Sequence, residues 1–565
     1  MPTSWRDYGV LATIALVGVA LCSGSIADGL CLDDRAMLST VTGPRMLPAA
    51  APFDLFTLAN GDPRVTLQLV DRGVLPWFAA PDLRVAFWRP VASFSHAVDF
   101  ILFPTYPAWM HVQNLLWYAV LIITVGLLYR RLIGVGWAWI LASALYAVHG
   151  IHGLSVGWIS ARNTLMGGTF AAMAWIAHDR WIRDGWTQGR YLAPVALAVA
   201  LLSSEAAVTI LVYLVAQAVL SHGDARSRAL RRLAPCAVVT GAWLIVYLAM
   251  GKGARGSGVY LDPIREPIVF ASALPGRVLT DMSAQLFGPS PHSLVVPIGW
   301  AAFVLACVPL AFKHQVAALF LWGFAASTFL VAGVSPDPRH LLHAGLGAFP
   351  VVALTLASAF RSCEPRPAPR AWRATALAAA SLLTVLLGPL SALAMPHQAA
   401  RAGVVQRAYD RVPLLESGVS TQGKTVLVVN AGDPIRAVLW LFPPYPRSSP
   451  APRILSLAHV YGSVLVTRSG PRSLTIYAPN GHDGAPAGLM FHRPPLLEGT
   501  TLRLSGVTIR VTRAGGPGEA TLAEYEFDKP LEDPSLTWLA WNGLRYAPFQ
   551  PPPEGQTVWV DAQPP

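Results

Sequence analysis

The chain has 565 residues, of which 53% are hydrophobic and only 13% charged, and its mean hydropathy is +0.46. Soluble domains carry about a quarter charged residues, so this composition excludes a disordered chain, a collagen-like fibre and an ordinary cytosolic enzyme. The formal net charge of +11 accompanies 5 cysteines that form no CxxC pair, which argues against a disulfide framework and a zinc finger.

Apolar segments recur through the first 395 residues. A spanning helix needs about 20 mostly apolar residues. By this measure the sequence predicts a polytopic α-helical membrane protein with about eleven spans, at roughly 9–27, 109–129, 133–150, 160–179, 190–204, 206–222, 233–250, 294–312, 315–333, 340–360 and 373–395.

Lysine and arginine are distributed unevenly between the short loops. With a cytoplasmic N-terminus, the cytoplasmic loops hold Arg130, Arg131, Arg180, Arg183, Arg190, Arg226, Arg228, Arg231, Arg232, Lys313, Arg361, Arg366, Arg370 and Arg373. The short loops opposite hold only Arg339. Since positive loops favour the cytoplasm, the N-terminus is predicted inside and the C-terminus outside. The chain has no Asn-x-Ser/Thr sequon, which suits a multi-pass protein of the bacterial inner (plasma) membrane.

Three longer regions then lie on the outer side: the loop at 28–108, the segment at 251–293 and the tail from 396 to 565. In the tail, short runs with β-type composition alternate with Pro, Gly and Asn turns. These runs are KTVLVVN (424–430), YGSVLVTR (461–468), RSLTIYA (472–478) and GVTIRVTR (506–513). Their spacing predicts an all-β sandwich or barrel, so we expect a transmembrane domain at 1–395 and an extracytoplasmic β domain at 396–565.

The first outer loop carries adjacent carboxylates, Asp33 and Asp34, within about ten residues of the membrane exit. Two neighbouring acids at a membrane boundary are costly unless cations pair with them or chemistry uses them. They are candidates for a general base that accepts a proton from an attacking hydroxyl. The alternative is a solvated turn, or a cap for the helix that follows.

Two cationic candidates precede the second span. Arg89 stands before a proline, and a guanidinium at the lipid surface suits a phosphate because its donors can bind two oxygens. His111 lies at the start of the span. Interfacial snorkelling of Arg89 and a helix-start role for His111 are the structural alternatives.

The segment at 149–167 places His149 and His152 three residues apart and brings Arg162 into an apolar helix. A buried arginine within a span is expensive and is usually partnered or functional. The two histidines could ligate a metal, but no third ligand is evident. We therefore assign no metal ligands and leave a divalent metal cofactor open.

Two further groups complete the candidate set. Glu205 lies between two short spans, either as a polar turn or as part of the site. Arg339 and His340 lie at the outer mouth of a late span and form a cationic cluster suited to phosphate or pyrophosphate. A capped helix start is the alternative for this cluster.

The order of these features resembles the GT-C superfamily of membrane glycosyltransferases. It is most similar to the transmembrane part of tetratricopeptide-containing O-mannosyltransferase-like proteins and their bacterial relatives. The matching positions, which cover roughly residues 5–395, are Asp33-Asp34, Arg89-Pro90, His111 with Asn114, His149 with His152, Arg162, Glu205, and Arg339 with Gly345. The chain departs from the family pattern where Asn163 replaces an acid and Ser204 a lysine, and no tetratricopeptide array follows.

The resemblance implies an enzyme that moves a sugar from a polyprenyl-phosphate donor to a hydroxyl of a glycan, lipid or protein acceptor on the outer face. Asp34, or else Asp33, would be the general base. The donor phosphate would meet Arg89, Arg162, Arg339 and His340, with His111, His149, His152 and Glu205 near the acceptor or in support. Transfer would invert the anomeric carbon.

Other classes of function stay open from the sequence alone. The lost acid and lysine favour a non-catalytic scaffold or envelope assembly factor that binds a partner through the outer β domain. A transporter is less favoured, because no matched broken helices occur in two repeated halves. Nucleic-acid binding is not expected, because the excess cations lie in the loops that set membrane orientation.

Overall fold

The computed structural model describes residues 5–43, 45–221, 223–263, 266–288, 295–360, 370–411, 423–444, 453–460, 462–479, 481–482, 489–491, 496–514, 520–541 and 545–560. The chain divides into two compact units. The helical unit comprises residues 1–31, 88–250 and 263–404, and the β-rich unit comprises 32–87, 251–262 and 405–565. Two of the cytoplasmic-loop cations expected from the sequence, Arg361 and Arg366, lie outside the described residues.

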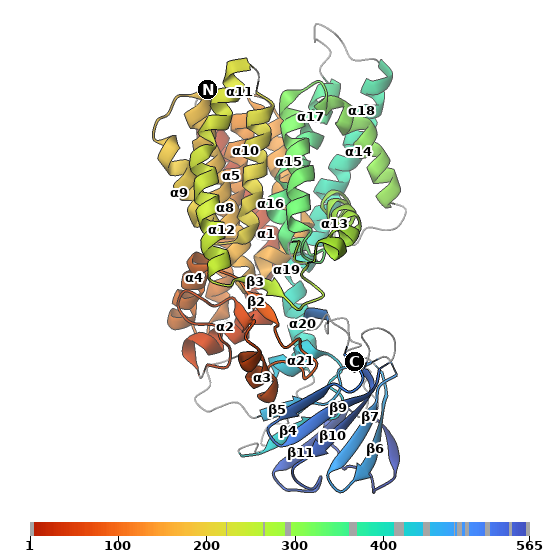
Figure 1. Ribbon diagram of the computed structural model, residues 1–565. Coiled ribbons are helices and arrows are strands. Elements are labelled where there is room, and N and C mark those ends of the chain that lie inside the picture. The colour runs from red at the N-terminus through yellow and green to blue at the C-terminus, as the bar shows by residue number, and fades with distance from the viewer. Residues whose placement is uncertain are drawn as a thin grey trace. The chain divides into compact units, whose positions relative to one another are not determined.

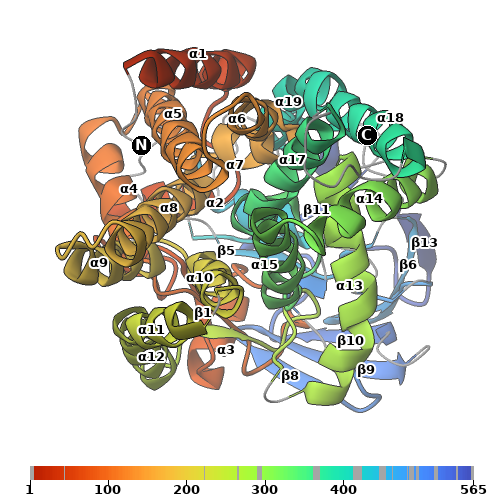
Figure 2. The same ribbon diagram turned by 90° about the horizontal axis from the view of Figure 1, so that it is seen from above.

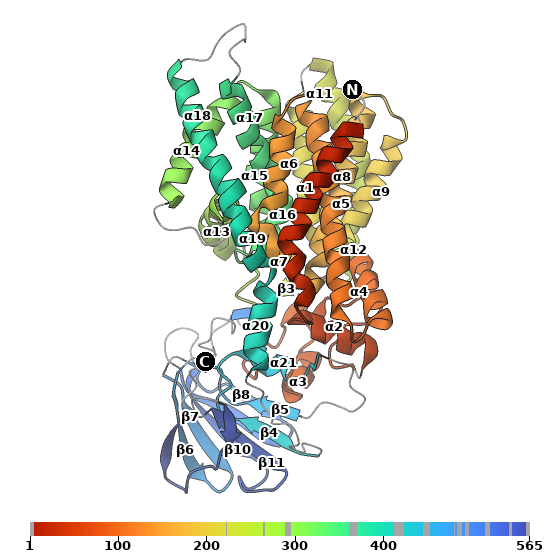
Figure 3. The ribbon, with the colours of Figure 1, turned by 180° about the vertical axis from the view of Figure 1, so that it is seen from behind.

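The helical unit is built from helices, many of them long and apolar (Figure 1). They are α1 (Trp5–Cys22), α4 (Pro90–Leu102), α5 (Pro107–Ile133), α6 (Ala138–Val148), α7 (Gly153–Gly157), α8 (Arg162–Arg183), α9 (Gly189–Leu201), α10 (Thr209–Val219), α11 (Gly223–Arg232), α12 (Ala234–Ala249), α13 (Pro267–Phe287), α14 (Val295–Ala311), α15 (Gln315–Val331), α16 (Leu341–Ala344), α17 (Ala348–Phe360), α18 (Arg370–Val385) and α19 (Ser391–Ala399). Seen along the helices in Figure 2, α1, α5 and α6 lie together, and α14 lies beside α18. Figure 3 shows α1 running along α5 and α6.

Helix α5 shows how the sequence sets these boundaries. It begins with Pro107, whose missing N–H costs nothing in the first turn. It ends before Gly134, which adopts φ 91°, a conformation that glycine reaches without a Cβ penalty. Arg130 and Arg131 lie in its last turn, where cations interact favourably with the helix dipole.

Each of the predicted apolar segments contains a helix in the structure. By length and composition, five described segments can cross a membrane: Trp5–Ala27, Pro107–Ile133, Arg226–Ala249, Pro338–Phe360 and Ala371–Asp410. The bent pair Ala138–Val148 and Gly150–Gly157 would be a sixth span, and several other apolar helices are shorter. Several apolar helices, five of them long enough to cross a membrane, are therefore confirmed in the described residues, whereas the count of about eleven spans stays a prediction.

The β-rich unit contains two larger sheets. The first is antiparallel with the order β13-β6-β7-β10-β9-β8, and the second is mixed with the order β12-β11-β4-β5. Their strands are β4 (Thr425–Val428), β5 (Arg453–Ser456), β6 (Val464–Gly470), β7 (Ser473–Tyr477), β8 (Thr501–Leu504), β9 (Val507–Ala514), β10 (Ala520–Phe527), β11 (Leu536–Trp541), β12 (Tyr546–Pro548) and β13 (Thr557–Val560). Each of the four predicted strand runs overlaps one of these strands, namely β4, β6, β7 and β9.

The tail is not all-β, so that part of the expectation is wrong. Helix α21 (Pro434–Leu439) connects β4 to β5, and the two strands are parallel, as a crossover connection requires. Helix α20 (Arg401–Asp410) precedes them. The strand composition revealed β-structure, but the short helix between β4 and β5 left too weak a periodic pattern to be recognised.

The first outer loop is also divided differently from the expectation, because residues 32–87 belong to the β-rich unit. This part contains α2 (Asp33–Thr42), β1 (Thr57–Asn60), α3 (Pro63–Asp71) and β2 (Arg84–Ala86), and β2 pairs with β3 (Gly253–Arg255). Trp77 is buried in the core of the unit and donates to the carbonyl of Leu457 at 2.9 Å. Arg453 on β5 pairs with Asp71 at 2.8 Å. These contacts join residues that are far apart in the sequence, so the sequence could not reveal that residues 32–87 belong to the β-rich unit.

Candidate functional site

Arg89 forms an ion pair deep in the helical unit. Its Nε lies 2.7 Å from Oε2 of Glu205, and both side chains are mostly buried. Arg89 lies directly before Pro90, which begins α4, while Glu205 opens the short turn between α9 and α10. When the amide of Asn163 is turned so that both its nitrogen and its oxygen have hydrogen-bond partners, the oxygen accepts a hydrogen bond from Arg89 at 3.2 Å. The structure thus brings together Arg89 and Glu205, two candidates that lie 116 positions apart.

Arg339 is held in place by its neighbours. Asp337 accepts from Nε and Nη2 of Arg339, both at 3.0 Å, and the guanidinium carbon lies 4.5 Å from the centroid of the Trp158 ring. Burial raises the pKa of Asp337, but the positive charge of Arg339, the hydrogen bonds that Arg339 donates and the charge of His340 together outweigh that effect and bring the pKa down to about 2. Asp337 is therefore ionised at neutral pH, and Arg339 has a fixed orientation.

His340 connects the two arginines electrostatically. Its ring lies within electrostatic range of Arg89, Arg339 and Asp337, all in the helical unit. Segments from α4 and from the turn before α16 therefore contribute cations to one neighbourhood. A group of this composition can stabilise a phosphate, because guanidinium donors match its oxygens.

Arg162 has a different environment from the other arginine candidates. It is fully buried and lies 2.6 Å from Asp99. It also donates to Asn114 at 2.7 Å, to Ser95 at 2.9 Å and to the carbonyl of Met110 at 3.0 Å. These contacts occupy its guanidinium within the protein and give Arg162 a structural role, so the expected role in phosphate binding gains no support from them.

Asp99 was missed by the sequence analysis. It lies on α4 within an amphipathic run that gave no reason to single it out. It supplies the negative charge beside Arg162 that Asn163 lacks, from a different helix. Only the packing of α4 against α8 reveals this compensation.

The candidate histidines of the helical unit lie in its core. His111 is buried, and its Nε2 lies 3.3 Å from the carbonyl oxygen of Gly29. The rings of His149 and His152 are 5.7 Å apart, and both pack against Phe349. Among the described residues no group of three or more His, Cys, Asp and Glu side chains is placed to hold a metal ion. Aromatic packing is thus the visible role of this histidine pair.

The two candidate bases belong to the β-rich unit, at the start of α2. Asp34 is fully buried, whereas the neighbouring Asp33 is exposed. The residue before them, Leu32, has φ 48°, which is rare for a residue with a branched side chain. Strained backbone of this kind persists where the surroundings hold it, and it is frequent at functional sites.

Two residues of α20 bind Leu32 and Arg35, which flank the candidate bases in the sequence. Gln406 accepts a hydrogen bond from the backbone N–H of Leu32 at 2.8 Å. Asp410, one turn later, binds Arg35 through two hydrogen bonds, at 2.9 and 2.5 Å. Gln406 also donates to Asp410 at 3.1 Å. The position of Asp34, between Leu32 and Arg35, is therefore fixed on both sides.

No family model matches the chain, and a search of curated proteins finds no match. Among solved structures, the Archaeoglobus fulgidus oligosaccharyltransferase in the apo form is similar, with a TM-score of 0.43 and 12% identity. That likeness covers 77% of this chain and 64% of the other chain. This chain therefore spans less than two thirds of that protein.

Two further solved structures are similar to this chain. ArnT from Cupriavidus metallidurans in the apo state has a TM-score of 0.40 and 12% identity, covering 78% of this chain and 85% of that one. The arabinofuranosyltransferase AftD from Mycobacteria has a TM-score of 0.36 and 16% identity, covering 94% and 40%. The resemblance to GT-C glycosyltransferases is thus met again among solved structures, but at TM-scores below 0.5 it carries no argument about activity.

Proposed function

We propose that this protein is a membrane glycosyltransferase that moves a sugar from a polyprenyl-phosphate donor to an acceptor hydroxyl on the outer face of the membrane. The observation that carries the proposal is that the short segment 158–163 meets both arginines, since Arg339 lies over the ring of Trp158 and Arg89 donates to Asn163, in a unit of apolar helices. A lipid-linked phosphate needs both an apolar path for its tail and cations for its headgroup. The order of sequence motifs adds the resemblance to the GT-C superfamily.

In the proposed reaction Asp34 accepts the proton of the acceptor hydroxyl. The hydroxyl oxygen then forms a bond to the anomeric carbon, while the bond from that carbon to the phosphate oxygen breaks. The electron pair leaves with the polyprenyl phosphate, whose negative charge Arg89 and Arg339 stabilise. Attack opposite the leaving group inverts the anomeric carbon. Asp34 is favoured over the exposed Asp33 as the base, because hydrogen bonds from α20 fix the backbone on either side of it.

The internal partners of the two arginines are compatible with phosphate binding. The Arg339–Asp337 pair is partly exposed to solvent, and such pairs contribute about 1 kcal/mol or less. A phosphate with more charge can therefore compete for the guanidinium. Glu205 would hold Arg89 in place until the donor arrives.

The test uses the purified full-length protein and a panel of radiolabelled polyprenyl-phosphate sugars with candidate acceptors. Asp34→Asn should lower kcat at least about 100-fold, because general-base catalysis contributes roughly 10²–10⁴-fold. Arg339→Ala should raise KM for the donor. Glu526→Gln, which changes an exposed carboxylate on β10, is the matched control and should turn over like the native protein.

Turnover that survives in Asp34→Asn, Asp33→Asn and the double variant would refute the acidic pair as the base. Unchanged donor affinity in Arg339→Ala would exclude Arg339 as a phosphate ligand. Each variant must be compared at equal yield in the membrane.

A second candidate function is a non-catalytic scaffold that binds a partner through the β-rich unit. It is favoured by the internal pairing of both arginines, since Arg89 binds Glu205 and Arg339 binds Asp337. A scaffold would transfer no sugar from any donor, yet Asp34→Asn would leave its assembly role intact.

A further inference from the structure

The turn between α8 and α9 gathers cations at one end of the helical unit. Helix α8 ends at Arg183 and α9 begins at Gly189. A Cβ atom on Gly189 would lie only 2.5 Å from the carbonyl oxygen of Ala177, so the two helices approach closely. Arg180, Arg183 and Arg190, here called the arginine rim, therefore lie at the adjoining ends of these two closely packed helices.

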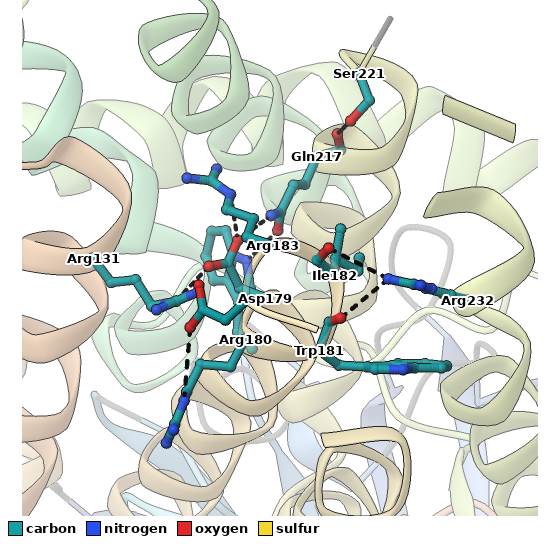
Figure 4. Close-up of polar contacts among 11 residues, drawn as sticks. Arg131, Asp179, Arg180, Trp181, Ile182, Arg183, Gln217, Ser221 and Arg232 are labelled. Atoms are coloured by element: carbon teal, nitrogen blue, oxygen red, sulfur yellow. Dashed lines mark hydrogen bonds and ion pairs between the residues drawn. The ribbon is translucent and has the colours of Figure 1, made fainter. Parts of the chain in front are cut away.

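The acid nearest to the rim is already neutralised inside the protein. Asp179 is fully buried and accepts from Arg131 at 2.5 Å, from Arg183 at 2.9 Å and from Gln217 at 2.5 Å. Figure 4 shows these three side chains directed at Asp179. The second acid, Asp184, binds Arg131 at 3.0 Å and lies 4.0 Å from Arg180. The rim thus keeps an excess of positive charge.

Aromatic rings orient two cations of the rim. The guanidinium carbon of Arg180 lies 4.1 Å from the centroid of Trp186, and that of Arg190 lies 4.4 Å from the centroid of Tyr191. Stacking on a ring holds a guanidinium by its face and leaves N–H groups at its edge for oxygen acceptors. The side chain of Arg180 is 45% exposed, so these groups are accessible.

A further arginine strengthens the end of α8. Nη1 of Arg232 donates to the carbonyl oxygens of Trp181 and Ile182, at 3.1 and 3.3 Å (Figure 4). A cation at this position satisfies carbonyl groups that have no partner within the helix. The backbone that carries Arg180 and Arg183 is therefore fixed before any ligand binds.

An exposed apolar face begins beside the rim. On α9, Tyr191 and Val195 lie one turn apart and are 59% and 58% exposed, and Leu192 is 47% exposed. Since α9 is an apolar helix, this face suits hydrocarbon rather than water. A ligand with a negative head and an apolar tail matches both surfaces.

We propose that the arginine rim binds the phosphodiester headgroup of an anionic phospholipid, with an acyl chain along the exposed face of α9. Basic clusters at the ends of membrane helices attract anionic lipids. The site is separate from Arg89 and Arg339, so it does not depend on the proposed transferase activity. It would stabilise the α8–α9 turn when the membrane contains anionic lipid.

The experiment measures lipid retention by mass spectrometry of the intact full-length protein released from detergent. Cardiolipin and phosphatidylcholine are added at equal concentrations to the native chain and to the double variant Arg180→Gln/Arg190→Gln. The native chain should retain cardiolipin preferentially. Each substitution should weaken retention roughly fivefold, or roughly 25-fold together if the effects add. Arg183 is left unchanged because it pairs with buried Asp179.

The matched control is Arg503→Gln/Arg510→Gln, which removes two exposed arginines from β8 and β9 and should retain cardiolipin like the native chain. Equal retention by the rim variant and the native chain would overturn the proposal, as would equal retention of phosphatidylcholine. Displacement of cardiolipin by an equal concentration of inorganic phosphate would overturn it in favour of a free-anion site. If the rim variant does not fold, retention by the native chain that does not fall with salt would refute the proposal.

Discussion

At the scale of single residues, the stability of the helical unit depends on the fully buried ion pair of Arg162 and Asp99. Removing one member of a buried pair leaves an uncompensated charge, which costs about 3–5 kcal/mol. Arg162→Met should therefore destabilise the protein strongly, as measured by thermal unfolding in detergent. Arg162→Met/Asp99→Asn should recover part of the loss because it removes both charges. Equal stability of the single variant and the native chain would contradict this role.

A second prediction at this scale concerns the buried histidines of the β-rich unit. Burial lowers the pKa of His459 and of His482, and the charge of His482 further opposes protonation of His459. The pKa of each ring is lower in the folded chain than in the unfolded chain, where it is about 6.5. Above about pH 6.5 both rings are neutral in either state, so they cost the folded state nothing. As the pH falls below about 6.5, the unfolded chain binds more protons than the folded one and stability declines.

Each histidine contributes at most about 1.4 kcal/mol of lost stability per pH unit until its folded pKa is reached. The measurement is thermal unfolding of the full-length protein between neutral and mildly acidic pH. The variant His459→Phe should show a shallower decline than the native chain. An identical pH dependence would show that other groups govern acid stability.

At the scale of elements, α20 acts as a support for the start of α2. Gln406 and Asp410 hold Leu32 and Arg35, and the strained φ of Leu32 needs such support. We therefore expect Asp410→Asn to accelerate hydrogen exchange at the start of α2. The control is Arg401→Gln, an exposed change on the same helix, which should leave that exchange unchanged.

The support of α2 by α20 also predicts an effect on catalysis, which can be measured apart from the effect on stability. If Asp34 is the base, Asp410→Asn should lower kcat while KM for the donor changes little, because the donor arginines are untouched. A fall in activity that follows only the loss of folded protein would argue against positioning. The alternation that predicted strands in the tail gave no indication of this support, since it depends on residues more than 370 positions apart.

At the scale of the whole molecule, membrane orientation is a prediction from loop charge. Single cysteines placed by Arg190→Cys and Arg510→Cys should differ in intact cells treated with a membrane-impermeant maleimide. The second should be labelled from outside, and the first only after the membrane is opened. Cys22, Cys31, Cys236 and Cys307 are buried, and Cys363 lies outside the described residues, so both variants are made in a Cys363→Ser chain, which provides the background. The reverse pattern would show an inverted topology.

Local composition was enough to predict the class of the molecule and the positions of its apolar helices, because hydrophobic content and span length can be read along the chain. The short β-type runs also identified β4, β6, β7 and β9, and the order of motifs selected Arg89, Glu205 and Arg339. The folded chain was needed to show which of these charges share a neighbourhood, that Asp99 compensates Arg162, and that residues 32–87 pack with the tail. These outcomes depend on contacts between distant segments, and such contacts are set by packing and burial rather than by any local pattern.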